Sequence, residues 1–100
     1  MPQANLAIVA HIEAKADRAE EVKTLLSSAL SLANEEKGTI NWFAVQIDNT
    51  HFAIFDTFVD EQGRQAHLNG KIAAALLGKA EELLVSAPQI MTANILASKV

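Results

Sequence analysis

Apolar residues near the N-terminus alternate with the period of a β-strand over residues 4–14. Both alternating sets are apolar, which is typical of a strand buried on both faces. The first set is Leu6, Ile8, Ala10 and Ile12, and the second is Ala7, Val9 and His11. The pattern predicts a first strand that is covered on each side.

A helical pattern follows, in which apolar residues recur at spacings of three and four until Gly38. Asp17 followed by Glu20 predicts a capping box at the start of this helix, and Gly38 supplies a stop at its end. The apolar positions are Val22, Leu25, Leu26, Ala29, Leu30 and Ala33. They predict one amphipathic helix that packs on the first strand.

Two more strand patterns, at residues 39–47 and 51–59, lie on either side of a short polar turn at residues 48–50. Strands joined by so short a turn pair in antiparallel fashion. The sequence therefore predicts a β-hairpin after the first helix.

A second helical region extends from about Glu61 to Val85, with Asp60 in position to cap its first turn. Glycine weakens a helix by about 1 kcal/mol relative to alanine, so we expect interruptions near Gly70 and Gly78. Pro88 ends the region.

A last strand is predicted at residues 89–97, which completes the order β-α-β-β-α-β. This order predicts an α+β, ferredoxin-like fold, with a four-stranded antiparallel sheet and both helices on one face. A chain of 100 residues is expected to form a single domain, residues 1–100.

The third predicted strand is apolar on both of its faces. Two helices can cover only one face of the sheet, so the other needs a second apolar surface, of which the simplest is the same face of another copy. We therefore expect a homodimer. The two sets of residues are Phe52, Ile54 and Phe58, and Ala53, Phe55 and Val59.

Composition narrows the possible functions. The net charge of −4, without a basic cluster, argues against nucleic-acid binding, and no apolar stretch is long enough for a membrane helix. The chain has no cysteine, which excludes thiolate chemistry and fits the cytoplasm as the expected compartment. Dinucleotide, P-loop, zincin and hydrolase motifs are missing, and the three histidines have no metal-ligand spacing, so no metal is expected.

The strongest candidates for chemistry are Asp56 and His67. Asp56 has apolar neighbours on its own face of the third strand, and a charged carboxylate in such surroundings needs a partner. His67 lies about two turns into the second helical region, which could bring it to Asp56. The pair is either a proton-transfer site or a structural link between helix and strand.

Four further residues stand out by type and position. Trp42, the only tryptophan, is either a core residue or a wall against which an aromatic ligand stacks. His11 is either a packed strand residue or a group facing a cavity or the partner. Asn94 is the polar residue of the last strand, and it could orient a ligand or satisfy the backbone. His51 follows the turn and is expected to be solvated.

Three segments in order along the chain resemble the antibiotic biosynthesis monooxygenase domain. They are Gly38–Trp42 (GTINW), Phe55–Phe58 (FDTF) and Arg64–Leu68 (RQAHL). Residues 7–26 also look like the first strand and helix of that family, so the likeness covers nearly the whole chain. The resemblance implies a dimeric α/β barrel.

The resemblance also implies an activity. Members of the family include monooxygenases that oxidise quinols or polycyclic phenols with O₂ and without a cofactor. Asp56 stands where the family usually has Glu, Trp42 where it often has Tyr, and His67 on the family's histidine. The haem-degrading branch is disfavoured, because Phe58 replaces its Trp and the helix near residues 74–75 has no histidine.

The working hypothesis is that His67, oriented by Asp56, deprotonates a phenolic substrate held against Trp42 and Phe58, with His11 and Asn94 as further substrate-binding candidates. Deprotonation raises the electron density of the ring enough for it to reduce O₂. An acid–base isomerase on the same fold, and a barrel that binds a small ligand without catalysis, remain the alternatives.

Overall fold

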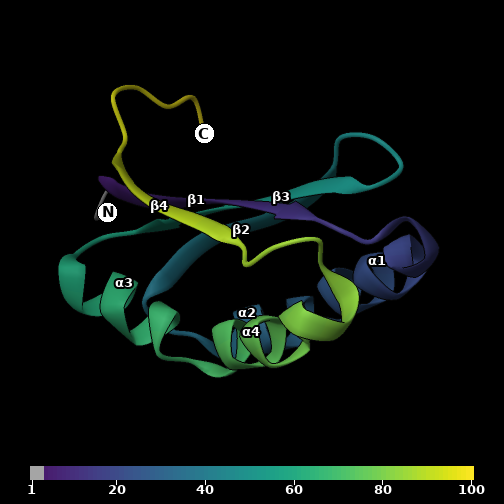
Figure 1. Cartoon of the computed structure of the whole chain (residues 1–100). Helices are drawn as coiled ribbons and strands as arrows, with labels where there is room; N and C mark the ends of the chain where they lie inside the picture. The colour runs from purple at the N-terminus through teal and green to yellow at the C-terminus, as the bar shows by residue number, and fades with distance from the viewer. Residues whose placement is uncertain (1–3) are drawn as a thin grey trace.

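The computed structural model describes residues 4–100, with helices and strands in the predicted order. The strands are β1 (Leu6–Glu13), β2 (Thr39–Gln46), β3 (His51–Phe58) and β4 (Gln89–Asn94), and they form one antiparallel sheet in the order β2-β3-β1-β4. The α-helices are α1 (Ala19–Ser28), α2 (Leu30–Glu35), α3 (Glu61–Leu68) and α4 (Lys71–Leu83). All of them lie on one face of the sheet, which confirms the ferredoxin-like α+β fold (Figure 1).

The first helical region differs from the prediction at its start and in its middle. A short 3₁₀ helix, Ala16–Arg18, precedes α1 and contains Asp17, so the predicted capping box is wrong and no side chain caps α1. The helix also bends at Ala29, which separates α1 from α2. The hydroxyls of Ser27 and Ser28 donate to backbone carbonyls one turn earlier, a contact that bends helices.

The second helical region begins as predicted, because Oδ1 of Asp60 accepts a hydrogen bond from the backbone N–H of Gly63 at 2.8 Å. It breaks at Gly70, where the backbone is extended and α4 starts. The expected break at Gly78 is wrong, since α4 continues through it. Burial of the apolar face of α4 outweighs the weak helix propensity of one glycine.

Each strand ends before its predicted boundary, the last by the widest margin, because residues 95–97 leave the sheet. The hydrophobic core lies between the sheet and the helices. It is built from alternate residues of β1 and β3 and from the inner faces of α1 and α4, including Ile12, Phe52, Ile54, Val22, Leu26 and Leu76. The alternation read from the sequence therefore sets which side chains face the helices.

No helix covers the other face of the sheet (Figure 1). Many of the side chains on this face are apolar. One row across it consists of Phe43, Phe55, Val9 and Met91, which pair in register on four adjacent strands. Phe43 is 54% exposed and Phe55 is 40% exposed. We call this surface the open face; it includes the neighbouring residues Val45, Ala53 and His11.

Two glycines bring the start of α3 against the start of β2. A Cβ atom on Gly38 would lie 2.7 Å from the Cα atom of Gly63, and one on Gly63 would lie 2.9 Å from the Gly38 carbonyl oxygen. Real Cβ atoms do not approach backbone so closely, so the contact requires glycine on both sides. Gly38, the first residue of the GTINW segment, thus has a packing role that positions α3.

We expect the Gly38→Ala variant to lose about 1–3 kcal/mol of unfolding free energy, because the added methyl group forces the two backbones apart. Gly78→Ala is the matched control, since a Cβ atom there meets nothing within 4 Å and alanine favours the helix. Urea unfolding followed by circular dichroism measures both. Equal stability of Gly38→Ala and the wild-type chain would contradict the close-contact role.

Candidate active site between the helices and the sheet

Asp56 and His67 meet between β3 and α3. The Asp56 side chain is fully buried and faces the helices, and His67 is only 7% exposed. Nε2 of His67 lies 2.8 Å from Oδ2 of Asp56. Neither oxygen of Asp56 accepts a well-aligned hydrogen bond from the described residues, so this contact is a close ion pair rather than a linear hydrogen bond. The predicted approach of the two residues is present, while their catalytic role stays a prediction.

A second carboxylate binds the other side of the His67 ring. Glu36 follows the end of α2, and its Oε1 lies 2.6 Å from Nδ1 of His67. The same oxygen accepts a hydrogen bond from the Thr39 hydroxyl at 2.8 Å. Glu36 is not among the candidates that the sequence singles out, yet its side chain is largely buried, whereas the neighbouring Glu35 is exposed. We call Glu36, Asp56 and His67 the charged cluster.

The charged cluster determines the protonation state of His67. Burial by itself lowers the pKa of His67, but the close contacts with the carboxylates of Asp56 and Glu36 outweigh burial and raise the pKa to about 9. At neutral pH the ring is therefore an imidazolium with a proton on each nitrogen. An imidazolium cannot accept another proton, so a role of His67 as a base requires its neutral form, and that role stays a prediction. In its charged form the ring supplies a buried positive charge.

Two neighbouring side chains hold the His67 ring and its helix. The Phe58 ring packs on it with a centroid distance of 5.4 Å and an interplanar angle of 44°. Arg64, one turn earlier on α3, donates hydrogen bonds from Nη1 to the carbonyls of Ala7 and Ala93, which lie on β1 and β4. Its other guanidinium nitrogens bind Glu61. Phe58 is fully buried and supports the His67 ring, while its role as a wall for a ligand stays a prediction.

A small apolar void adjoins the charged cluster on the side of β1 and β4. Its volume is about 30 Å³, enough for one or two water molecules or for O₂, but not for an aromatic ring. Asp56 and His67 are the polar groups that line it. The remaining lining residues are apolar: Ile8, Ala10, Ile54, Leu68, Ile72, Ala73, Leu76 and Ile90.

A larger cavity adjoins the charged cluster on the side of β2. Its volume is about 160 Å³, and Glu36 and Trp42 both line it. We call it the Trp42 cavity. Trp42 pairs with Asp56 in the register of β2 and β3, so the indole and the buried carboxylate are neighbours on one face of the sheet. Nε1 of Trp42 is buried and has no hydrogen-bond acceptor among the described residues.

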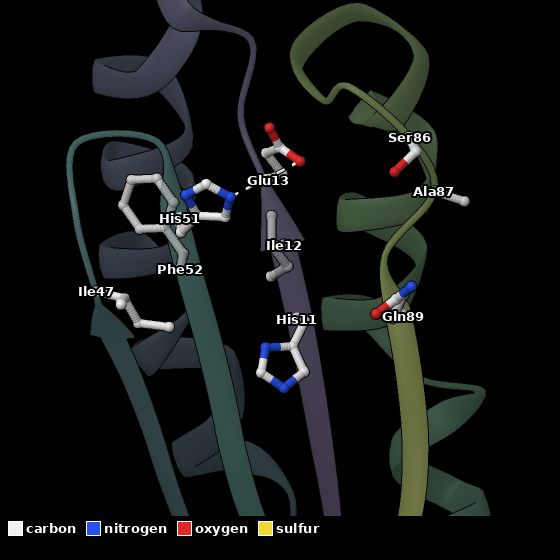
Figure 2. Close-up of a pocket in the computed structure, with 9 residues that line it drawn as sticks. All are labelled: His11, Ile12, Glu13, Ile47, His51, Phe52, Ser86, Ala87 and Gln89. Atoms are coloured by element: carbon white, nitrogen blue, oxygen red, sulfur yellow. Dashed lines mark ion pairs between the residues drawn. The ribbon is translucent and has the colours of Figure 1, made fainter.

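The remaining candidates lie apart from the charged cluster. His11 is exposed on the open face and lines a cavity of about 330 Å³ at the far end of β1 and β3. Figure 2 shows it near Gln89 of β4, with His51 and Glu13 joined as an ion pair further along. His51 is half-exposed, as expected, and also contacts Asp48. Asn94 is exposed at the end of β4, opposite Leu6.

The geometry of the charged cluster is that of a row. The two carboxylates contact opposite nitrogens of one ring, so their oxygens do not converge on a common point. Among residues 4–100 no group of three potential ligands is placed to hold a metal ion. No helix in the same range is long and apolar enough to cross a membrane.

Comparison with known proteins places the chain in a family. No family model matches it, and no curated protein matches it. A solved structure from Nitrosomonas europaea, described as a protein of unknown function, is 46% identical, with 100% of this chain and 97% of that chain covered and a TM-score of 0.95.

Two more distant structures carry a functional name. A "putative antibiotic biosynthesis monooxygenase" from Nitrosomonas europaea is 14% identical, with 92% of this chain and 99% of that chain covered and a TM-score of 0.81. A protein of the same name from Deinococcus radiodurans is 16% identical, with coverage of 95% and 96% and a TM-score of 0.82. The chain belongs to the family of the 46% identical Nitrosomonas protein, and its fold is that of the antibiotic biosynthesis monooxygenase domain.

The raised pKa of His67 predicts how stability depends on pH. Because the folded-state pKa of about 9 exceeds the ordinary value of 6.5, the stabilisation is fully present below pH 6.5 and is lost as pH rises through about 9. We expect the unfolding free energy to fall across that range. The His67→Gln variant should lack this fall, whereas His51→Gln should retain most of it.

The pKa itself is measurable by NMR titration of the His67 ring protons. Glu36→Gln removes one of the two carboxylates, so it should lower the pKa of His67, and Glu35→Gln is the matched control. A wild-type pKa near 6.5 would contradict the doubly paired imidazolium.

Proposed function

We propose that the protein is a small cofactor-independent monooxygenase that oxidises a phenol or quinol with O₂. The observation that supports this most directly is the buried imidazolium between two carboxylates, with a cavity on each side. The shared fold with proteins named as monooxygenases adds to it. Charged groups enclosed by apolar walls act more strongly than the same groups in water.

The catalytic residues of this proposal are His67 and Asp56. His67 acts as a cation, and Asp56 is the carboxylate paired with it. A carboxylate of the charged cluster takes the phenolic proton, and the phenolate transfers one electron to O₂ to give a phenoxyl radical and superoxide. The imidazolium of His67 stabilises the anions that form. Recombination of the radicals and loss of water convert a ring C–H and O₂ to a carbonyl group and H₂O.

The void beside Asp56 is suited to hold O₂ and the superoxide that forms from it. It is apolar on most of its surface and has room for a molecule of the size of O₂. Asp56 and the His67 ring face it, so superoxide formed there meets the positive charge directly. Apolar walls also exclude the bulk water that would otherwise quench a radical pair.

We further propose that the open face is the contact between two copies of the chain. Four strands contribute a continuous apolar row, including Phe43, Phe55 and Met91, that no part of the described chain covers with helices. Burying apolar area contributes roughly 25 cal/mol per Å², and exposed patches of this kind mark interfaces. Two copies packed face to face correspond to the barrel implied by the family resemblance.

Oxygen uptake tests the activity. The purified protein is incubated with a panel of hydroquinones, naphthols and other phenols, and uptake is compared with uncatalysed autoxidation. We expect Asp56→Asn and His67→Gln to lower kcat by about 10²-fold, because each removes a charge of the cluster whose electrostatic stabilisation the reaction uses. Substitution of the exposed His51 by Gln should leave kcat unchanged. Product formation under strict anaerobiosis would point to an isomerase instead.

The rate should also fall as pH rises through about 9, because His67 then loses the proton that makes it cationic. In His67→Gln the residual rate should lack this fall. The measurement is the pH dependence of kcat for the wild-type protein and for His67→Gln, in buffers of constant ionic strength. A rate that rises through pH 9 with the wild-type protein would contradict a role for the imidazolium.

The dimer is tested by a matched pair of surface substitutions. Phe43 on the open face and Leu77 on α4 are exposed to nearly the same extent, 54% and 53%. We expect Phe43→Glu to yield a monomer in sedimentation equilibrium and Leu77→Glu to remain a dimer. A wild-type monomer at micromolar concentration would contradict the interface.

A further inference from the structure

The Trp42 cavity has a volume close to that needed by one aromatic ring. It lies between α2 and the start of β2, and its volume of about 160 Å³ is close to the roughly 150 Å³ of a cavity that binds benzene. Apolar side chains form part of its lining, with Leu30 and Ile40 half-exposed at its rim. A second fused ring exceeds this volume.

Trp42 lines the cavity together with the polar residues Asn34, Thr39 and Asn41. Its side chain is partly buried and packs against the hydrophobic core. Aromatic rings pack against an indole in offset or edge-on geometry, with a gain beyond the buried area. Trp42, which the sequence analysis offers as a possible stacking surface, thus lines a cavity in which a ligand can contact it.

Glu36 is the carboxylate among the residues that line this cavity. Its Oε1 is occupied by Thr39 and His67, whereas its Oε2 accepts no hydrogen bond from residues 4–100. Oε2 lies beside Gly70, where a Cβ atom would come within 3.2 Å of it. The Glu36 side chain is 20% exposed, while that of Asp56 is 0% exposed beside a void too small for a ring.

We propose that the Trp42 cavity binds a single-ring phenol and that Glu36 is the residue that receives its proton. The chemistry of this assignment rests on the proposed function. The phenolic O–H bond breaks, an O–H bond to Oε2 of Glu36 forms, and the electron pair stays on the phenolate oxygen. Neutral Glu36 then no longer balances His67, whose positive charge stabilises the phenolate.

The single tryptophan makes the proposal directly testable, since all tryptophan fluorescence comes from Trp42. The probe is phenol, titrated without oxygen so that no turnover occurs, and anisole is the matched ligand without a hydroxyl. We expect phenol to change the emission saturably and to bind at least about tenfold more tightly than anisole, as for a hydrogen bond to a charged group. Calorimetric competition should find no displacement of phenol by 1-naphthol.

Variants identify the carboxylate. We expect Glu36→Gln to weaken phenol binding about tenfold or more. The neighbouring and exposed Glu35→Gln is the matched control and should bind as the wild-type chain does. Asp56→Asn should retain phenol binding. Circular dichroism confirms that each variant is folded before titration.

Failure of this assignment can be told from failure of the proposed function. The cavity assignment is overturned if the protein takes up oxygen but phenol does not change the Trp42 emission. It is also overturned if Asp56→Asn, and not Glu36→Gln, loses phenol binding. In both cases the proposed monooxygenase activity is unaffected. If phenol binds through Glu36 but no phenol is ever oxidised, the binding site stands and the proposed function is overturned.

Discussion

The structure depends on one interaction, the imidazolium of His67 held between Asp56 and Glu36. A carboxylate buried in the middle of a strand is unfavourable unless a positive charge accompanies it. Removing one member of such a buried pair typically destabilises a protein by about 3–5 kcal/mol, because the remaining charge stays in the apolar interior. The charged cluster therefore ties together three separate segments of the chain: β3, α3 and the link between α2 and β2.

The position of α3 that this interaction needs is set by several weaker contacts. The two facing glycines, Gly38 and Gly63, allow the helix start to touch the start of β2. Arg64 fixes the middle of the helix to sheet carbonyls, and Phe58 supports the ring itself. These contacts explain why the glycine, the arginine and the histidine of the resemblance occur in one structural unit. A histidine on a less constrained helix would not meet both carboxylates.

Sequence reasoning predicted the part of the site that follows from periodicity. Strand parity places Asp56 among apolar residues on its own face of the strand, and the position of His67 two turns into the following helix indicates that the two can meet. Periodicity could not find Glu36, because this residue follows the last turn of α2 and the path of the loop decides where it points. It also could not tell that Phe58 supports His67, or that Ile8 is the residue of β1 that pairs with Asp56, which leaves His11 on the face away from the charged cluster.

The register of the sheet separates the two proposed functions of β3. Asp56 and Phe58 face the helices, while Phe55 and Thr57 face the other way, so the chemistry and the dimer contact use alternate residues of one strand. A shift of one residue would exchange the two sets.

The pairing with β2 contains one irregularity, at Ile40, which brings Trp42 opposite Asp56 and leaves Ile40 at the rim of the Trp42 cavity. A β-bulge next to a functional site re-aims a side chain in this way. The extra residue at Ile40 therefore places Trp42, which lines the cavity on the β2 side, directly opposite the buried Asp56 on β3.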